Sequence, residues 1–155
     1  MARQKIAIIQ SRLGEREVDL YKVINFPRGL IGYEDKRRFA LLQIRAEAPL
    51  LILQSMEEPD LGLLVADPYA FHPEYALRIG DAEQNLLKVA AAADLAVLVT
   101  ATIPPGKPEE TVLNLLGPIL INRKARLGLQ VPQAEGDSPS RIFVHKREEA
   151  PRRHG

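Results

Sequence analysis

Few side chains in this sequence could perform chemistry, and the candidates do not converge on one site. Cysteine is absent, which excludes a thiolate nucleophile, a thiolate metal site and a disulfide framework. No two of the three histidines, His72, His145 and His154, have the spacing of a helical or ribbon metal site. Hard cations need carboxylates at alternate loop positions, and no loop supplies enough of them. We therefore predict no metal ion and no cofactor.

A catalytic triad can be written from Ser55, His72 and Asp67, but its sequence context does not favour catalysis. Ser55 lacks the strained, glycine-flanked turn that presents a nucleophile, and Asp67 precedes Pro68 in a turn-forming pair. The glycines of segment 27–33 precede no helix whose amide end could hold a phosphate. We expect a binding protein rather than an enzyme. A hydrolase is the competing class, and alanine at His72 would test it.

The densest acidic cluster of the body consists of Glu57, Glu58 and Asp60, in a loop between two apolar runs. One interpretation is a solvated hairpin tip that charge keeps soluble. The other is an anionic patch that faces a basic partner. The residues alone leave both open.

Basic residues gather at the C-terminal end of the chain. Segment 141–155 carries a net charge of +3 and the rest of the chain −2, which together give the formal +1. Glu148 and Glu149 interrupt the basic residues, and no ladder of aromatic residues accompanies them. This pattern disfavours direct nucleic-acid binding. A small β-barrel that binds nucleic acid through its basic tail nevertheless remains the alternative function.

The elements that must position these residues are short strands. A chain of 155 residues that is 46% hydrophobic is long enough for one core and short for two. Short apolar runs between turn signals predict a mainly β domain. The expected strands are 4–10, 16–23, 38–44, 50–55, 61–66, 76–79, 95–103, 111–115, 119–122, 127–131 and 142–145.

The clearest hairpin joins the runs 50–55 and 61–66 through the loop 56–60. Both runs are apolar on both faces, which is typical of the wall of a barrel or sandwich with covered sides. We therefore place this hairpin centrally in the sheet.

One helix is expected, beginning after Gly80 and ending near Asp94, with Asp81 as its cap and residues 90–93 as its small face. The apolar stretch at the N-terminus is too short for a signal peptide, and the longest uncharged stretches are too short to cross a bilayer. These features favour a cytoplasmic protein.

Three stretches go beyond a generic β protein. They are a glycine-leucine turn, a leucine-glutamine-serine strand end with an aspartate-proline corner, and an asparagine-leucine block before a glutamine: segments 25–34, 49–55 with 66–68, and 111–122 with 128–130. In this order and spacing they resemble the FliW family of flagellar assembly factors. The match runs from Phe26 to Gln130.

The resemblance implies an antiparallel β-barrel-like single domain with one short helix, over residues 1–147, followed by a disordered basic tail at 148–155. It also implies a cytoplasmic monomer without catalytic activity. Two proteins are its implied partners in turn, flagellin and the RNA-binding translational repressor CsrA. When flagellin leaves for export, the freed protein would capture CsrA and relieve repression of flagellin synthesis.

Two groups of residues then become candidates for partner binding. The first is acidic and could weaken the attraction of CsrA for RNA phosphates; it comprises Glu57, Glu58 and Asp60, with Glu109 and Glu110 as a second set. The second is polar and stands at strand ends: Gln54, Ser55, Asn114 and Asn122. For the polar group the competing interpretation is that the side chains pair backbone groups at barrel corners, as Asp67 and Gln130 would.

Overall fold

The computed structural model describes residues 4–136 and 138–145. Ten strands, one α-helix and four short 3₁₀ turns form within these residues. The strands are β1 (Ile6–Ser11), β2 (Gly14–Asp19), β3 (Ile24–Asn25), β4 (Arg38–Gln43), β5 (Leu51–Ser55), β6 (Gly62–Ala66), β7 (Leu95–Thr102), β8 (Val112–Asn122), β9 (Leu127–Gln130) and β10 (Arg141–Phe143). The helix is α1 (Asp81–Leu87).

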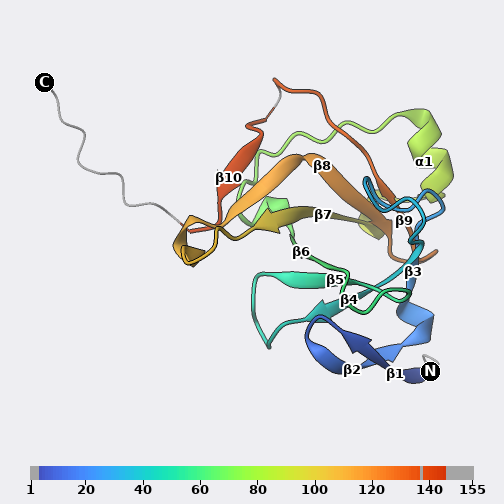
Figure 1. The fold of residues 1–155 in the computed structure, drawn as a ribbon. Coiled ribbons are helices and arrows are strands. Elements are labelled where there is room, and N and C mark those ends of the chain that lie inside the picture. Colours follow the sequence, from blue (N-terminus) through green and yellow to red (C-terminus); the bar gives the residue numbers. More distant parts are fainter. Residues whose placement is uncertain (1–3, 137, 146–155) are drawn as a thin grey trace, which may run out of the picture.

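The strands form a ring, which confirms the predicted barrel-like, mainly β fold (Figure 1). The order is β10-β8-β7-β6-β5-β4-β3-β9, and β9 also pairs with β8, so the sheet closes on itself. All pairs are antiparallel except the single bridge between β3 and β9. The predicted hairpin is confirmed as β5 and β6, and it lies centrally, between β4 and β7.

The ring is filled by aromatic and branched side chains. Phe26 and Phe39 lie edge to face, with ring centroids 5.4 Å apart, among Leu53, Val65 and Ile119. A side chain at position 128 would overlap the Phe26 ring, because a Cβ there would lie 2.3 Å from a ring carbon. Glycine in the family-like segment 128–130 therefore follows from packing.

The long strand β8 was expected as two strands, 111–115 and 119–122, and is continuous in the structure. Its register against β7 shifts between the pairs Leu98–Ile119 and Thr100–Asn114. This irregularity takes up Gly117 and Pro118, which a regular ladder would not accommodate. One half of β8 pairs with β10 and the other half with β9.

Two other predictions about strands are wrong. Residues 76–79 form no strand; the N–H groups of Ala76 and Arg78 instead donate to the side chains of Ser138 and Gln133. Residues 20–23 do not continue β2, since a 3₁₀ turn forms at Leu20–Lys22.

The helix α1 is shorter than predicted and is capped differently. It ends at Leu87 because Lys88 adopts the left-handed conformation, with φ of 54°. Its N-cap is Gly80, and no side chain caps it, so the role expected of Asp81 is not seen. Residues 90–93 lie beyond the helix. The predicted tail at 148–155 lies outside the described residues.

Outside the ring, β1 and β2 form a separate two-stranded sheet, here called the β1–β2 ribbon (Figure 1). Its inner side chains Ile9, Leu13 and Val18 pack against Ala40 and Ile52 of the ring. The ribbon therefore covers β4 and β5 from outside.

Candidate partner-binding surface

The loop between β5 and β6, together with the end of β5, forms a braced turn that we call the β5–β6 corner (residues 54–60). Gln54 is fully buried, and its amide nitrogen lies 3.1, 3.3 and 3.1 Å from the carbonyl oxygens of Ser55, Glu58 and Pro59. Its amide oxygen accepts the N–H of Arg12 at 3.0 Å, which ties the turn of the ribbon to this corner. Gln54 thus stabilises the loop from inside.

Ser55 braces the same corner. Its buried hydroxyl oxygen accepts the N–H groups of Glu57 and Glu58, at 3.1 and 3.0 Å. This is the local turn bonding that serine favours at strand ends. The hydroxyl is therefore occupied by the backbone and is not presented to a substrate.

The three acids of the corner differ in what they contact. One carboxylate oxygen of Glu57 accepts the N–H groups of Arg37 and Arg38, at 2.9 and 2.7 Å, and so holds the corner to the start of β4. Glu58 lies 4.0 Å from the Lys36 ammonium, and Asp60 is exposed. Of this predicted patch, Glu58 and Asp60 remain available to a partner.

The second acidic pair lies at the connection between β7 and β8. Glu109 and Glu110 belong to a short 3₁₀ turn, Pro108–Glu110, and Glu109 is exposed. Glu110 borders a surface hollow of about 520 Å³ that Phe143 of β10 also lines. In the same region the half-buried Asn114 amide donates to the Thr100 and Thr102 hydroxyls, at 3.1 Å each.

Asn122, the last residue of β8, is buried and used internally. Its amide nitrogen donates to the carbonyl oxygens of Leu87 and Lys88, at 2.8 and 3.2 Å, and its oxygen accepts the N–H groups of Lys124 and Ala125. It therefore satisfies the C-terminal carbonyls of α1 and shapes the β8–β9 turn at once.

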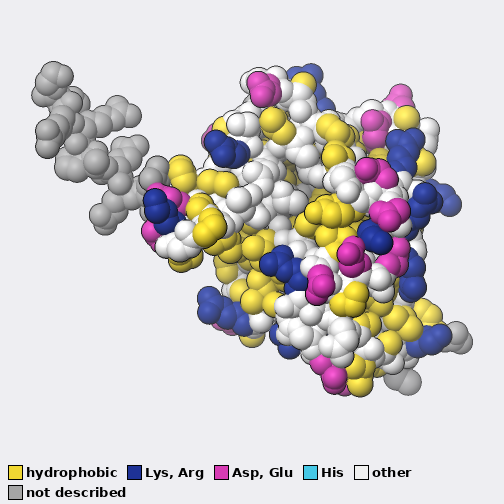
Figure 2. Space-filling view, in the orientation of Figure 1, with side chains coloured by type: hydrophobic (Ala, Val, Ile, Leu, Met, Phe, Trp, Pro, Cys, Tyr) yellow, Lys and Arg dark blue, Asp and Glu magenta, His cyan; other side chains and the backbone are white. Residues whose placement is uncertain are grey.

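The predicted residues consequently fall on separate parts of the ring rather than in one site. The corner holds five of them, the β7–β8 connection and the first part of β8 hold three, and the last residue of β8, beside the end of α1, is the ninth. Acidic and basic side chains interleave on the face shown in Figure 2, so this face carries no field of a single sign.

Sequence reasoning did not single out two exposed apolar side chains on the family-like loop. Ile31 is 59% exposed and Tyr33 38% exposed. The Gln130 side chain fixes this loop, because its oxygen accepts the Ile31 N–H and its nitrogen donates to the Gly117 carbonyl, both at 2.9 Å. Gly29 turns the chain with φ of 64°, and a Cβ there would lie 2.6 Å from the Glu34 backbone. The family-like segment 25–34, which contains both residues, was the sequence signal that could have identified them.

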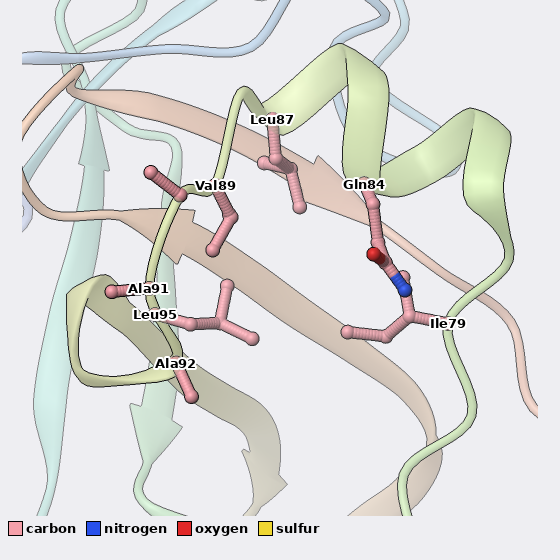
Figure 3. Close-up of a pocket in the computed structure, with 8 residues that line it drawn as sticks. Ile79, Gln84, Leu87, Val89, Ala91, Ala92 and Leu95 are labelled. Carbon is pink, nitrogen blue, oxygen red and sulfur yellow. The ribbon is translucent and has the colours of Figure 1, made fainter.

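An apolar hollow of about 280 Å³ lies between the end of α1 and the start of β7. Figure 3 shows Leu87, Val89 and Leu95 around this space, with the Gln84 amide extending beside Ile79. No titratable side chain lines it, so it offers no acid–base chemistry.

In the described part of the chain, no cluster of histidine, aspartate and glutamate has the geometry to hold a metal ion. Among the same residues, no helix has the length and apolarity needed to cross a membrane.

Comparison with known proteins gives one consistent result. The FliW protein family model matches residues 7–143. The flagellar assembly factor FliW of Desulfovibrio desulfuricans is 57% identical over 147 residues, which cover 94% of this chain and 88% of that protein. The same factor from Nitratidesulfovibrio vulgaris strain DP4 is 54% identical over 145 residues, covering 94% of this chain and 84% of that protein. A crystal structure of the flagellar assembly factor FliW superposes with a TM-score of 0.83 at 28% identity, over 92% of this chain and 99% of that one.

Proposed function

The chain belongs to the FliW family of flagellar assembly factors, and on this basis we propose that it regulates flagellin synthesis by binding two proteins in turn. While flagellin is present, the protein holds flagellin. Once flagellin has been exported, the protein binds the translational repressor CsrA and antagonises it. In this proposal the protein acts as a cytoplasmic monomer and performs no catalysis.

The braced β5–β6 corner carries the proposal. Gln54, Ser55 and Glu57 use their polar atoms to fix the loop, which leaves Glu58 and Asp60 exposed on a rigid support. A repressor that binds RNA must present basic side chains to phosphates. Carboxylates fixed beside that surface lower the potential that attracts RNA, so repression falls even where the RNA site stays uncovered.

The buried polar residues support the proposal indirectly. Gln54, Ser55 and Asn122 contact backbone groups of their own chain, so their part in binding is to shape the loops beside them. The direct contacts then belong to Glu58 and Asp60, with Glu109 and Asn114 as a second surface. Exclusive binding of flagellin and CsrA would follow if the two partners overlap on either surface.

A gel-shift assay tests the function. Flagellin messenger RNA is mixed with this protein, with CsrA, and with both. We expect no shift with this protein alone, loss of the CsrA shift when it is added, and return of that shift when flagellin is added. A shift with this protein alone would instead favour the nucleic-acid-binding alternative. An unchanged CsrA shift would contradict the proposal.

The corner is tested in the same assay with the double variant Glu58→Gln, Asp60→Asn. We expect it to need about three to ten times more protein to release the RNA, since two charges are lost from the field. Its dependence on salt should also weaken. The matched control is Glu74→Gln, Glu135→Gln, which removes two exposed charges elsewhere. Equal behaviour of the two variants would remove the corner from the mechanism.

A further inference from the structure

The β1–β2 ribbon has two strand edges without a partner strand among the described residues, one on β1 and one on β2. β1 pairs with β2 and with no other strand of the described residues. Proteins usually protect an edge strand with a charged side chain, a proline or a bulge. Residues 6–11 contain none of these features. An open, uncharged edge of this kind is a template for a further strand.

The outer face of the ribbon is unusually apolar on β1. Along this strand Ala7 and Ile9 turn toward the ring, while Ile6 and Ile8 turn outward and are 52% and 64% exposed. A ribbon with one covered face normally carries polar side chains at its outward positions. Two outward isoleucines on a free edge form an exposed apolar patch of the kind found at interaction sites.

Charge on the neighbouring strand indicates what that molecule carries. Glu15 and Glu17 lie on the same outer face of β2, opposite Gln10 and Ile8. Both side chains are exposed, and neither carboxylate forms a hydrogen bond or an ion pair with another described residue. Asp19 continues the row but is used internally, since it accepts the N–H groups of Lys5 and Tyr21. The open carboxylates are thus Glu15 and Glu17.

We propose that β1 is the docking strand for the repressor: a basic segment of CsrA pairs with the β1 edge, covers Ile6 and Ile8, and places lysine or arginine side chains on Glu15 and Glu17. This inference rests on the proposed function for the identity of the partner. The chemistry that selects it is an extended segment with basic residues at alternate positions.

The dimensions of a sheet permit this contact. A strand added to β1 lies two strand spacings from β2, about 10 Å. The aliphatic part of a lysine or arginine can lie along the exposed isoleucines, with its charged end reaching the glutamates. Alternate residues of the added strand repeat at about 6.6 Å, as Glu15 and Glu17 do, so two basic residues meet two acids.

The ribbon and the corner would then act together. The N–H of Arg12, in the ribbon turn, donates to the buried Gln54 of the corner, and the Arg12 guanidinium donates to the Gly62 carbonyl. Docking on the ribbon would therefore bring CsrA beside Glu58 and Asp60. Basic residues held by Glu15 and Glu17 are withdrawn from RNA, and the corner repels the phosphates that remain.

The closing experiment measures the affinity of the full chain for CsrA by calorimetry. We expect Glu15→Lys, Glu17→Lys to weaken binding at least about tenfold, because two attractive pairs become repulsive. The control Glu74→Lys, Glu135→Lys changes net charge equally and should bind within about twofold of the unchanged protein. Ile6→Ser, Ile8→Ser should weaken binding without altering the charge.

Hydrogen exchange supplies an independent measurement. Amides of β1 should become protected in the complex with CsrA, as added strand pairing requires. If the unchanged protein binds CsrA while the ribbon variants keep full affinity and β1 gains no protection, only the docking inference fails. If the unchanged protein does not bind CsrA, the proposed function fails and the inference fails with it.

Discussion

The β5–β6 corner and the β1–β2 ribbon both carry several carboxylates, but Glu57 at the corner and Glu15 and Glu17 on the ribbon are used in opposite ways. At the corner, Glu57 accepts two backbone N–H groups and Gln54 and Ser55 are buried beneath it. On the ribbon, the carboxylates of Glu15 and Glu17 form no hydrogen bond or ion pair with another described residue. The density of acids in the sequence therefore does not show which acids are available. Strand register and contacts with backbone groups decide which carboxylates are available to a partner.

The comparison predicts its largest effect at Gln54. Replacement by alanine should lower the free energy of unfolding by about 3 kcal/mol, because three carbonyls and the Arg12 N–H lose a buried partner together. The matched change on the ribbon, Gln10→Ala, removes an exposed side chain and should have little effect. Urea denaturation of both variants gives the measurement. Similar values for the two would show that the corner is not braced as described.

The second prediction compares the stability effects of one glutamate at the corner and one on the ribbon. Glu57→Ala should cost about 1 to 2 kcal/mol, since two N–H groups at the start of β4 lose a charged acceptor. Glu17→Ala should change stability by less than about 0.5 kcal/mol, because exposed side chains without partners contribute little. Thermal unfolding under identical buffer conditions compares them. A reversed order would contradict the division of roles between corner and ribbon.

The same division explains what could be predicted from the sequence. The hairpin β5–β6 was predicted because it depends on local information, two apolar runs joined by a short polar loop. The segment 76–79 was mistaken for a strand because its backbone groups pair with the side chains of Gln133 and Ser138, which lie far along the chain. The true end of α1 likewise depends on Asn122.

For the candidate site the limit was of the same kind. The sequence identified Glu57, Glu58 and Asp60 as one cluster, and only contacts with Arg37 and Arg38 separate the first from the others. Ile6 and Ile8 look like any strand residues in the sequence. Their exposure follows from the ribbon lying outside the ring, which no local pattern of residues reveals.

We expect substitution of Tyr75 to affect stability as substitutions at the corner do, and not as substitutions on the ribbon do. This side chain is buried, and its hydroxyl donates to the Leu115 carbonyl at 2.6 Å. Tyr75→Phe should cost about 1 kcal/mol, the usual value for one buried hydrogen bond. Burial, with a smaller contribution from Tyr69, raises the Tyr75 pKa to about 12.

The raised pKa predicts how this contribution depends on pH. Because the pKa is higher in the folded protein than its ordinary value of 10.0, the stabilisation is complete below pH 10 and is lost as pH rises toward 12. Unfolding experiments between these values should show a steeper loss for the unchanged protein than for Tyr75→Phe. Parallel curves would indicate that the hydroxyl is open to solvent in the way that the ribbon acids are.

The smallest effect is expected at Ile8, and it tests the ribbon most directly. Ile8 faces outward on β1 and is 64% exposed, so Ile8→Ser removes little buried apolar area and should change the free energy of unfolding by less than about 0.5 kcal/mol. Urea denaturation makes the measurement. A loss above about 1 kcal/mol would mean that the side chain is buried within the chain itself. The outer face of the ribbon would then be part of the protein's own packing. Unchanged stability of Ile8→Ser would instead show that this face is free to contact a partner.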